Sequence, residues 1–157
     1  MVHNDSKRYK LRVLIVTVST SRTLDSDVSG VSIEKRFRNE GIATERTICR
    51  DDEDAIIGTL LSRNDFDVYV FVGGTGPSRL DVTVESLRKV SRKEISGFGE
   101  LFRQKSNNQM AYLSNATLLL KGEKQIYCIP GSPDATEVAY PIISSFINHL
   151  YTELTKE

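Results

Sequence analysis

The residues best suited to chemistry follow an apolar run near the middle of the chain. Gly73-Gly74-Thr75-Gly76 contains glycines that allow positive φ angles and a close backbone approach to a ligand. Their N–H groups can form a concave seat for an anion such as phosphate. The pattern is not a Walker P-loop, and Arg79 stands where a dinucleotide-binding motif has its third glycine. Turn glycines that bind nothing remain the alternative.

Two aspartates flank this motif in the predicted arrangement. Asp81 follows the glycines, and Asp52 follows an alternating run at residues 42–49. Two carboxylates at one sheet edge can hold a magnesium ion that bridges phosphate oxygens. Helix capping competes for both residues, because Asp52 precedes a helical apolar period and Asp-Val-Thr can end a turn and begin a helix. The sequence leaves these roles open.

The apolar runs predict the sheet that must position these residues. Residues 12–18, 67–72 and 125–129 are nearly continuous apolar runs, typical of strands covered on both faces, and residues 42–49 indicate an edge or half-buried strand. Helical periods lie between the runs, and Pro141 predicts a kink or restart in the last one. The predicted fold class is therefore α/β, a three-layer sandwich with a mostly parallel sheet and helices on both faces.

Ligands bind beyond the carboxyl ends of such strands, because loops and helix amino termini converge there. The loops expected at that edge are polar or glycine-rich. Besides the glycine motif they contain Ser19, Ser21, Arg22, Ser29 and Gly30 after the first strand, and Pro130, Gly131 and Ser132 after the last. Glu100 either faces the ligand or is a solvated glutamate.

Composition restricts the class of protein. The chain has 157 residues with 21 Lys and Arg against 21 Asp and Glu, so no global charge attracts nucleic acid. The polar amino terminus and the absence of long apolar runs predict a cytoplasmic protein without a membrane or nucleic-acid partner. We expect a single domain over residues 1–157, with residues 1–10 a flexible extension, and we expect Cys49 and Cys128 to be buried free thiols.

Together these motifs resemble the molybdenum cofactor biosynthesis proteins of the MoaB/MogA type, a family that includes molybdopterin adenylyltransferases. The resemblance extends from about Arg12 to Ile147. It rests on five sequence blocks that occur in the same order as in the family, and five blocks in that order identify the family far more specifically than any one block does. The blocks are Thr17-Val18-Ser19 with Arg22 and Ser29-Gly30, Gly73-Gly74-Thr75-Gly76 with Asp81-Val82-Thr83, residues 97–103, Leu113-Ser114 and residues 130–133.

The resemblance implies a molybdopterin-binding fold that assembles as a homotrimer or homohexamer. It also implies that molybdopterin, a pterin with a dithiolene and a terminal phosphate, is joined to AMP from Mg-ATP with release of pyrophosphate. By position, Asp81 and Asp52 match the family's catalytic acids and would bind Mg²⁺, and Asp51 is the alternative to Asp52. No tightly bound organic cofactor is expected. The residues expected to bind the substrates are Ser19, Ser21, Arg22, Ser29, Gly30, Gly73, Gly74, Thr75, Gly76, Arg79, Glu100, Ser114, Pro130, Gly131 and Ser132.

The chain departs from the family pattern at two positions that bear on charge. Asn115 replaces a frequent arginine, and Asp134 replaces a frequent lysine. Weaker anion binding would follow unless Arg22, Arg79 or Arg103 compensates. Adenylylation of molybdopterin is therefore the leading hypothesis, and a non-catalytic molybdopterin-binding or carrier protein of the same pathway is the alternative.

Overall fold

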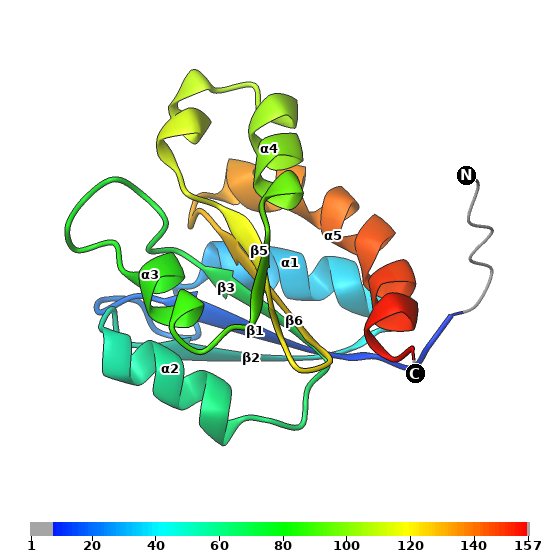
Figure 1. Ribbon diagram of the computed structural model, residues 1–157. Helices are drawn as coiled ribbons and strands as arrows, with labels where there is room; N and C mark the ends of the chain where they lie inside the picture. Colours follow the sequence, from blue (N-terminus) through cyan, green and yellow to red (C-terminus); the bar gives the residue numbers. More distant parts are fainter. Residues whose placement is uncertain (1–7, 157) are drawn as a thin grey trace.

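A mixed sheet lies between two layers of helices in the computed structural model, which describes residues 8–156 (Figure 1). The described residues form six strands in the order β2-β1-β3-β6-β5-β4. The elements along the chain are β1 (Arg12–Val18), α1 (Val28–Asn39), β2 (Ala43–Cys49), α2 (Glu53–Ser62), β3 (Val68–Val72), α3 (Thr83–Arg88), β4 (Lys93–Ile95), α4 (Ser96–Lys105), the 3-10 helix η1 (Gln109–Leu113), β5 (Thr117–Lys121), β6 (Lys124–Ile129) and α5 (Pro133–Leu154).

The sheet confirms the predicted α/β class. Strands β2, β1, β3 and β6 are parallel, and β2 is an edge strand as its alternation indicates. Strands β4 and β5 were not predicted from the sequence. They pair antiparallel to one another, and β5 also pairs antiparallel to β6. The tight connection between β5 and β6 contains Gly122, whose φ of 58° lies in the left-handed region that favours glycine. An apolar run followed by Lys-Gly was the available signal for this hairpin.

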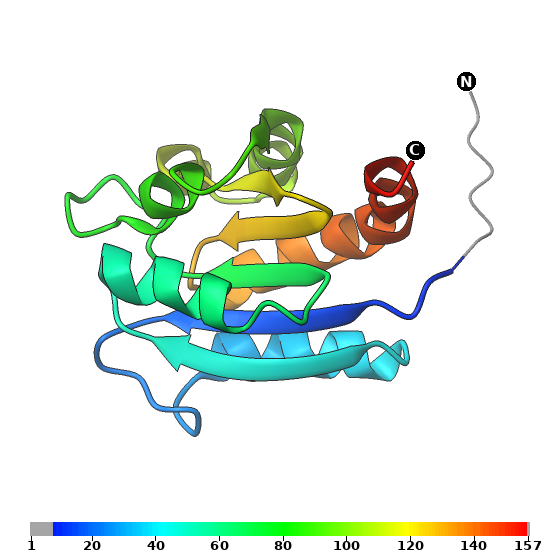
Figure 2. The same ribbon diagram turned by 60° about the horizontal axis from the view of Figure 1, so that its bottom comes forward.

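The central strands are apolar on both faces because each face carries its own core. In β1, Val13 and Ile15 pack with side chains from α1, α4 and α5, whereas Leu14 and Val16 pack with side chains from α2 and α3. Figure 2 shows the two layers from the side, with α1 and α5 behind the sheet and α2 in front. Alternate residues thus enter opposite cores, which explains the continuous apolar runs.

Helix α5 continues through Pro141 without a break, so of the kink or restart predicted there the restart is wrong. The neighbours of the proline, Tyr140 and Ile142, are buried, and Ile143 is fully buried. Packing of this face against the sheet stabilises the helix despite the backbone hydrogen bond that proline cannot donate. Within residues 8–156, no helix has both the length and the apolar character needed to cross a membrane.

A flexible extension is expected over residues 1–10. Residues 1–7 of it lie outside the described residues. From residue 8 onward the chain approaches α5. The backbone N–H of Tyr9 donates to Asn148 Oδ1 at 3.1 Å, and its ring centroid lies 4.6 Å from that of Tyr151. These contacts join the start of the described chain to the end of the last helix.

Both cysteines are buried free thiols, as predicted. Burial raises the pKa of Cys49 to about 11 and also raises the pKa of Cys128. Both thiols are therefore protonated at neutral pH, and neither is a candidate nucleophile.

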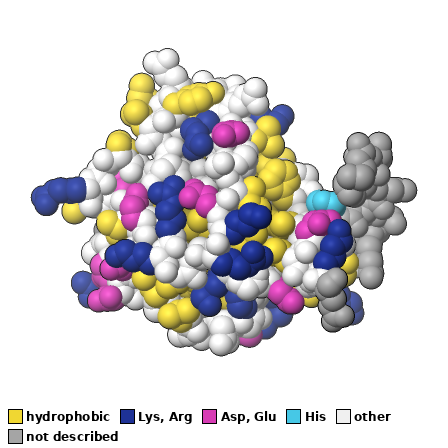
Figure 3. All heavy atoms as spheres, viewed as in Figure 1, with side chains coloured by type: hydrophobic (Ala, Val, Ile, Leu, Met, Phe, Trp, Pro, Cys, Tyr) yellow, Lys and Arg dark blue, Asp and Glu magenta, His cyan; other side chains and the backbone are white. Residues whose placement is uncertain are grey.

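Charged side chains are interspersed on the surface in Figure 3, where Lys and Arg lie among Asp and Glu. Arg88 pairs with Glu94 at 2.9 Å, and Lys89 pairs with Glu53 at 2.5 Å. Such exposed pairs contribute little to stability, but they balance charge locally.

Two glycines of α4 provide a test of how closely this helix packs on the sheet. A methyl group at Gly99 would lie 2.0 Å from the carbonyl oxygen of Ala116, whereas one at Gly97 would meet no described heavy atom within 4 Å other than its chain neighbours and the backbone of its own helix. Gly99→Ala should lower the free energy of unfolding by about 2 kcal/mol, because α4 must shift. Gly97→Ala should leave it unchanged or raise it by up to about 1 kcal/mol. Urea denaturation measures both, and equal midpoints would contradict the close packing.

Candidate functional site

The loops that follow the parallel strands meet at one edge of the sheet, as predicted. The N–H of Ser19, after β1, donates to the carbonyl of Cys49 at 2.9 Å, and the N–H of Gly73, after β3, donates to the carbonyl of Ile129 at 2.9 Å. Ser114, which precedes the antiparallel β5, reaches the same edge, where its hydroxyl donates to Thr75 Oγ1 at 2.9 Å. The glycine loop is therefore fixed from both sides.

The turn after β3 requires glycine. Gly73 and Gly74 have φ angles of 109° and 71°, which residues with a side chain rarely adopt. Thr83 holds the turn, because its Oγ1 donates to the carbonyl of Gly73 at 2.8 Å and its N–H donates to the carbonyl of Gly74 at 3.1 Å. A methyl group at Gly74 would lie 2.1 Å from Thr83 Oγ1. This turn leads the backbone into the wall of a cleft.

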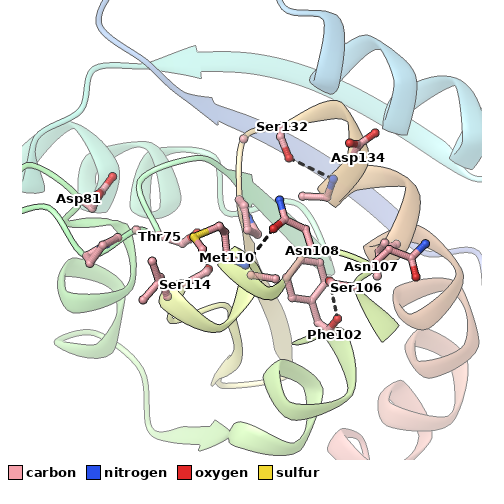
Figure 4. A pocket seen from close by; sticks show the side chains of 18 of the residues that line it. Thr75, Asp81, Phe102, Ser106, Asn107, Asn108, Met110, Ser114, Ser132 and Asp134 are labelled. Atoms are coloured by element: carbon pink, nitrogen blue, oxygen red, sulfur yellow. Dashed lines mark hydrogen bonds between the residues drawn. The ribbon is translucent and has the colours of Figure 1, made fainter. Parts of the chain in front are cut away.

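The cleft has a volume of about 840 Å³ and extends from the glycine loop to the first turns of α5 (Figure 4). Eight of the residues predicted for the site line it, namely Gly74, Thr75, Gly76, Asp81, Ser114, Pro130, Gly131 and Ser132. Ser132 is the N-cap of α5, and its Oγ accepts from the N–H of Ala135 at 3.2 Å. The amino terminus of α5 therefore lies at the cleft, where its dipole favours an anion.

Other predicted residues shape the cleft without lining it. Ser29, in the first turn of α1, donates its hydroxyl to the carbonyl of Gly131 at 2.8 Å. The N–H of Gly30 donates to Asp27 Oδ1 at 3.0 Å, and a methyl group there would collide with the same carboxylate. The Oγ of Ser19 accepts from the N–H groups of Ser21 and Arg22 at 3.3 and 3.1 Å. These contacts position the backbone around the cleft.

The three arginines expected to supply positive charge have different surroundings. Arg103 donates from Nη1 to the carbonyls of Ser114 and Ala116, both at 3.1 Å, so its guanidinium is held by backbone. Arg79 is exposed and does not line the cleft. Arg22 lies beside it, since its Nη1 would be 3.9 Å from a methyl group on Gly131. Glu100, also predicted to bind substrate, is exposed on α4 and does not line the cleft.

The adjacent aspartates after β2 have separate environments. Asp52 is the N-cap of α2, where its Oδ1 accepts from the N–H of Ala55 at 2.8 Å, and its Oδ2 lies 3.7 Å from Arg50 Nε. The competing capping role is thus confirmed. Asp51 Oδ1 is buried and has no hydrogen-bond partner among residues 8–156, and it would lie 3.5 Å from a methyl group on Gly74. Asp51, rather than Asp52, therefore stands next to the glycine loop.

Burial raises the pKa of Asp51, and the negative charges of Asp81 and then Asp52 raise it further. Asp81 is held by the N–H of Ser78, which donates to its Oδ2 at 3.1 Å. Residues 8–156 contain no group of three or more Asp, Glu, His or Cys that could bind a metal. Mg²⁺, however, commonly takes one or two carboxylates together with substrate phosphates and water. The orphaned oxygen of Asp51 and the carboxylate of Asp81 fit that ion.

One wall of the cleft was missed by the sequence analysis. It consists of the end of α4, the following turn and η1, including Asn107, Asn108 and Met110. The Asn-Asn pair is a turn signal, but no periodicity indicates that this turn lies opposite α5.

The fold and the cleft define an α/β ligand-binding protein whose site lies at the carboxyl ends of parallel strands. A family model described as "Probable molybdopterin binding domain" matches residues 14–149. The chain therefore belongs to this molybdopterin-binding family, and the resemblance drawn from its motifs is confirmed. Its role is in molybdenum cofactor biosynthesis.

Individual relatives agree over nearly the whole length. Molybdenum cofactor biosynthesis protein B of Staphylococcus carnosus (strain TM300) is 37% identical over 171 residues, covering 99% of this chain and 100% of that protein. A crystal structure of a molybdenum cofactor biosynthesis protein B has a TM-score of 0.89 at 34% identity and covers 95% of this chain and 98% of its own. The tungsten cofactor synthesizing protein MoaB from Pyrococcus furiosus has a TM-score of 0.84 at 28% identity, covering 96% and 100%.

Replacing Asp51 should stabilise the metal-free protein in a pH-dependent way. The pKa of Asp51 in the folded state is raised above the ordinary value of 3.8. Its ionisation therefore lowers the free energy of unfolding as the pH rises from the ordinary pKa to the raised pKa of the folded state. Asp51→Asn should therefore raise this free energy by about 1 kcal/mol at neutral pH. The gain should disappear below about pH 3.5, where the wild-type carboxyl is protonated.

Urea unfolding with a chelator at both pH values measures the difference. Asp52→Asn is the matched control, because asparagine also caps helices and should leave stability nearly unchanged at both pH values. A gain for Asp52→Asn instead of Asp51→Asn would contradict the assignment of the unpartnered carboxylate.

Proposed function

We propose that this protein adenylylates molybdopterin with Mg-ATP and releases pyrophosphate. The observation that supports the proposal is the buried, unpartnered oxygen of Asp51 beside the glycine turn. An unsatisfied buried carboxylate oxygen costs stability, and Asp81 increases that cost by repulsion. A cation bound by these carboxylates would offset both effects, beside a cleft that Asp81 and the glycine loop line.

This reaction requires alignment of the two phosphate groups and screening of their negative charges, and it does not require a general base. An oxygen of the terminal phosphate of molybdopterin forms a bond to the α-phosphorus of ATP. The bond from that phosphorus to the oxygen bridging to the β-phosphorus breaks, and its electron pair leaves with pyrophosphate. The attacking phosphate is already an anion at neutral pH, so no proton must be removed first. Mg²⁺, when bound, supplies positive charge that screens the repulsion between the phosphates.

The chain's own residues perform the binding. Asp51 and Asp81 would hold the cation, and the N–H groups of Gly74 to Gly76 would donate to phosphate oxygens. The amino terminus of α5, capped by Ser132, provides a second anion seat. Arg22 contributes positive charge beside Gly131. We further propose that the protein acts in the cytoplasm as a homotrimer or homohexamer.

A non-catalytic carrier of molybdopterin is the second candidate function. It is favoured by the shortage of positive charge, since Arg103 is held by carbonyls and Asn115 donates its amide to Glu85 Oε1 at 2.7 Å. Calorimetry separates the two candidates. A carrier binds molybdopterin but shows no magnesium-dependent binding of ATP, whereas the transferase binds both.

Substitution of the two proposed metal ligands should abolish adenylylation. Asp51→Asn and Asp81→Asn should each lower the rate of product formation at least about a hundredfold, since each removes charge stabilisation that the transition state requires. Asp52→Asn, which keeps the helix cap, should retain activity within about twofold. Chromatography of adenylylated molybdopterin, together with pyrophosphate release, measures the rates.

The outcomes discriminate between the hypotheses. If Asp52→Asn loses activity and Asp51→Asn retains it, Asp52 rather than Asp51 is the metal ligand. If the wild-type protein forms no product while an active homologue does under the same conditions, the transferase proposal is wrong, and binding of molybdopterin without ATP binding would then establish the carrier function.

A further inference from the structure

The end of the cleft farthest from the acid pair is a slot with apolar walls. It is bounded by the end of α4, by η1 and by the first turns of α5 (Figure 4). Phe102, Met110 and Val138 line it. Walls of this kind suit a flat heterocycle, while the polar groups along the rim determine which heterocycle fits.

Asn108 offers a donor at this rim. Its Oδ1 accepts from the N–H of Met110 at 2.9 Å, which fixes the amide and leaves Nδ2 to donate. Figure 4 shows this hydrogen bond and the position of Asn108 between η1 and Ser132. A ligand acceptor is therefore the group that matches this side chain.

Asp134 offers acceptors on the other wall. It is exposed in the first turn of α5, and no hydrogen bond or ion pair joins its carboxylate to another residue within 8–156. The other carboxylate lining this end, Glu137, is held by Arg36 Nη1 at 2.7 Å and by Ser32 Oγ at 3.2 Å. Of the two, Asp134 is the one available to a guest.

We infer that this slot takes the 2-amino-4-oxopyrimidine edge of a pterin, with Asp134 as the specificity-determining residue. That edge carries two adjacent donors, the 2-amino group and N3–H, which match the two oxygens of one carboxylate. Its 4-oxo group accepts from Asn108 Nδ2. Adenine presents a single exocyclic donor beside a ring acceptor, so one carboxylate oxygen would face a lone pair. The inference rests on the proposed function, and it orients molybdopterin with its phosphate at the glycine loop and its ring near α5.

Fluorescence titration with 6-hydroxymethylpterin tests the inference, because this probe lacks a phosphate and needs neither ATP nor magnesium. Wild-type protein should bind it saturably, and Asp134→Asn should weaken binding at least about tenfold by replacing an acceptor with a donor. Glu137→Gln is the matched control, since it removes the same charge from the same helix and should change the affinity less than about twofold. Circular dichroism establishes that both variants fold.

Several results would overturn the inference. They are the absence of saturable binding to the wild-type protein, equal affinity for the probe in Asp134→Asn, or an Asp134→Asn variant that loses adenosine binding and keeps the pterin. The second result would mean that Asp134 only interacts with the dipole of α5.

Failure of this inference can be told apart from failure of the proposed function. Asp81→Asn should bind the pterin probe like the wild type, because the acid pair does not contact it. If pterin binding depends on Asp134 but magnesium-dependent ATP binding is absent, the transferase proposal fails alone. If ATP binding is present and the affinity for the pterin does not depend on Asp134, the inference about Asp134 fails and the proposed function does not.

Discussion

The left-handed turn at Gly73 and Gly74 is the constraint on which the site depends. Its positive φ angles direct the backbone away from β3 and into the wall of the cleft. Thr83 fixes the turn through both its hydroxyl and its N–H, and Asp51 Oδ1 would lie 3.5 Å from a methyl group on Gly74. A side chain at Gly74 would displace Thr83, so one turn controls both the path of the glycine loop and the beginning of α3.

A buried charged network supports the neighbouring loop. Asp27 is fully buried, accepts from Thr17 Oγ1 at 2.5 Å and from the N–H of Gly30, and lies 3.4 Å from Arg46 Nη1. A buried carboxylate is tolerated when its oxygens are satisfied in this way. The network fixes the start of α1, from which Ser29 reaches Gly131. Asp27 thus contrasts with Asp51, whose buried oxygen has no partner within residues 8–156.

The cleft combines opposite electrostatic preferences along its length. The amino terminus of α5 brings the positive end of its dipole to the cleft, whereas Asp81 and Asp134 line it with negative charge and Asp51 lies behind Gly74. A guest with an anionic end and a hydrogen-bond-donating ring satisfies both preferences, provided that a cation accompanies the anion.

By itself, the sequence determined the α/β class, the parallel strands, the loops that meet at one edge and the glycine turn, because alternation, apolar runs and positive φ are encoded in neighbouring residues. It did not determine the β5–β6 hairpin or the wall formed by η1, whose partners are distant in the chain. Nor did it determine which of Asp51 and Asp52 lies beside the glycine turn. Only the tertiary structure decided that point, since the start of α2 places the Asp52 carboxylate on Ala55 and the Asp51 carboxylate near Gly74. Adjacent residues with the same chemistry differ only in the direction that the packed backbone gives them.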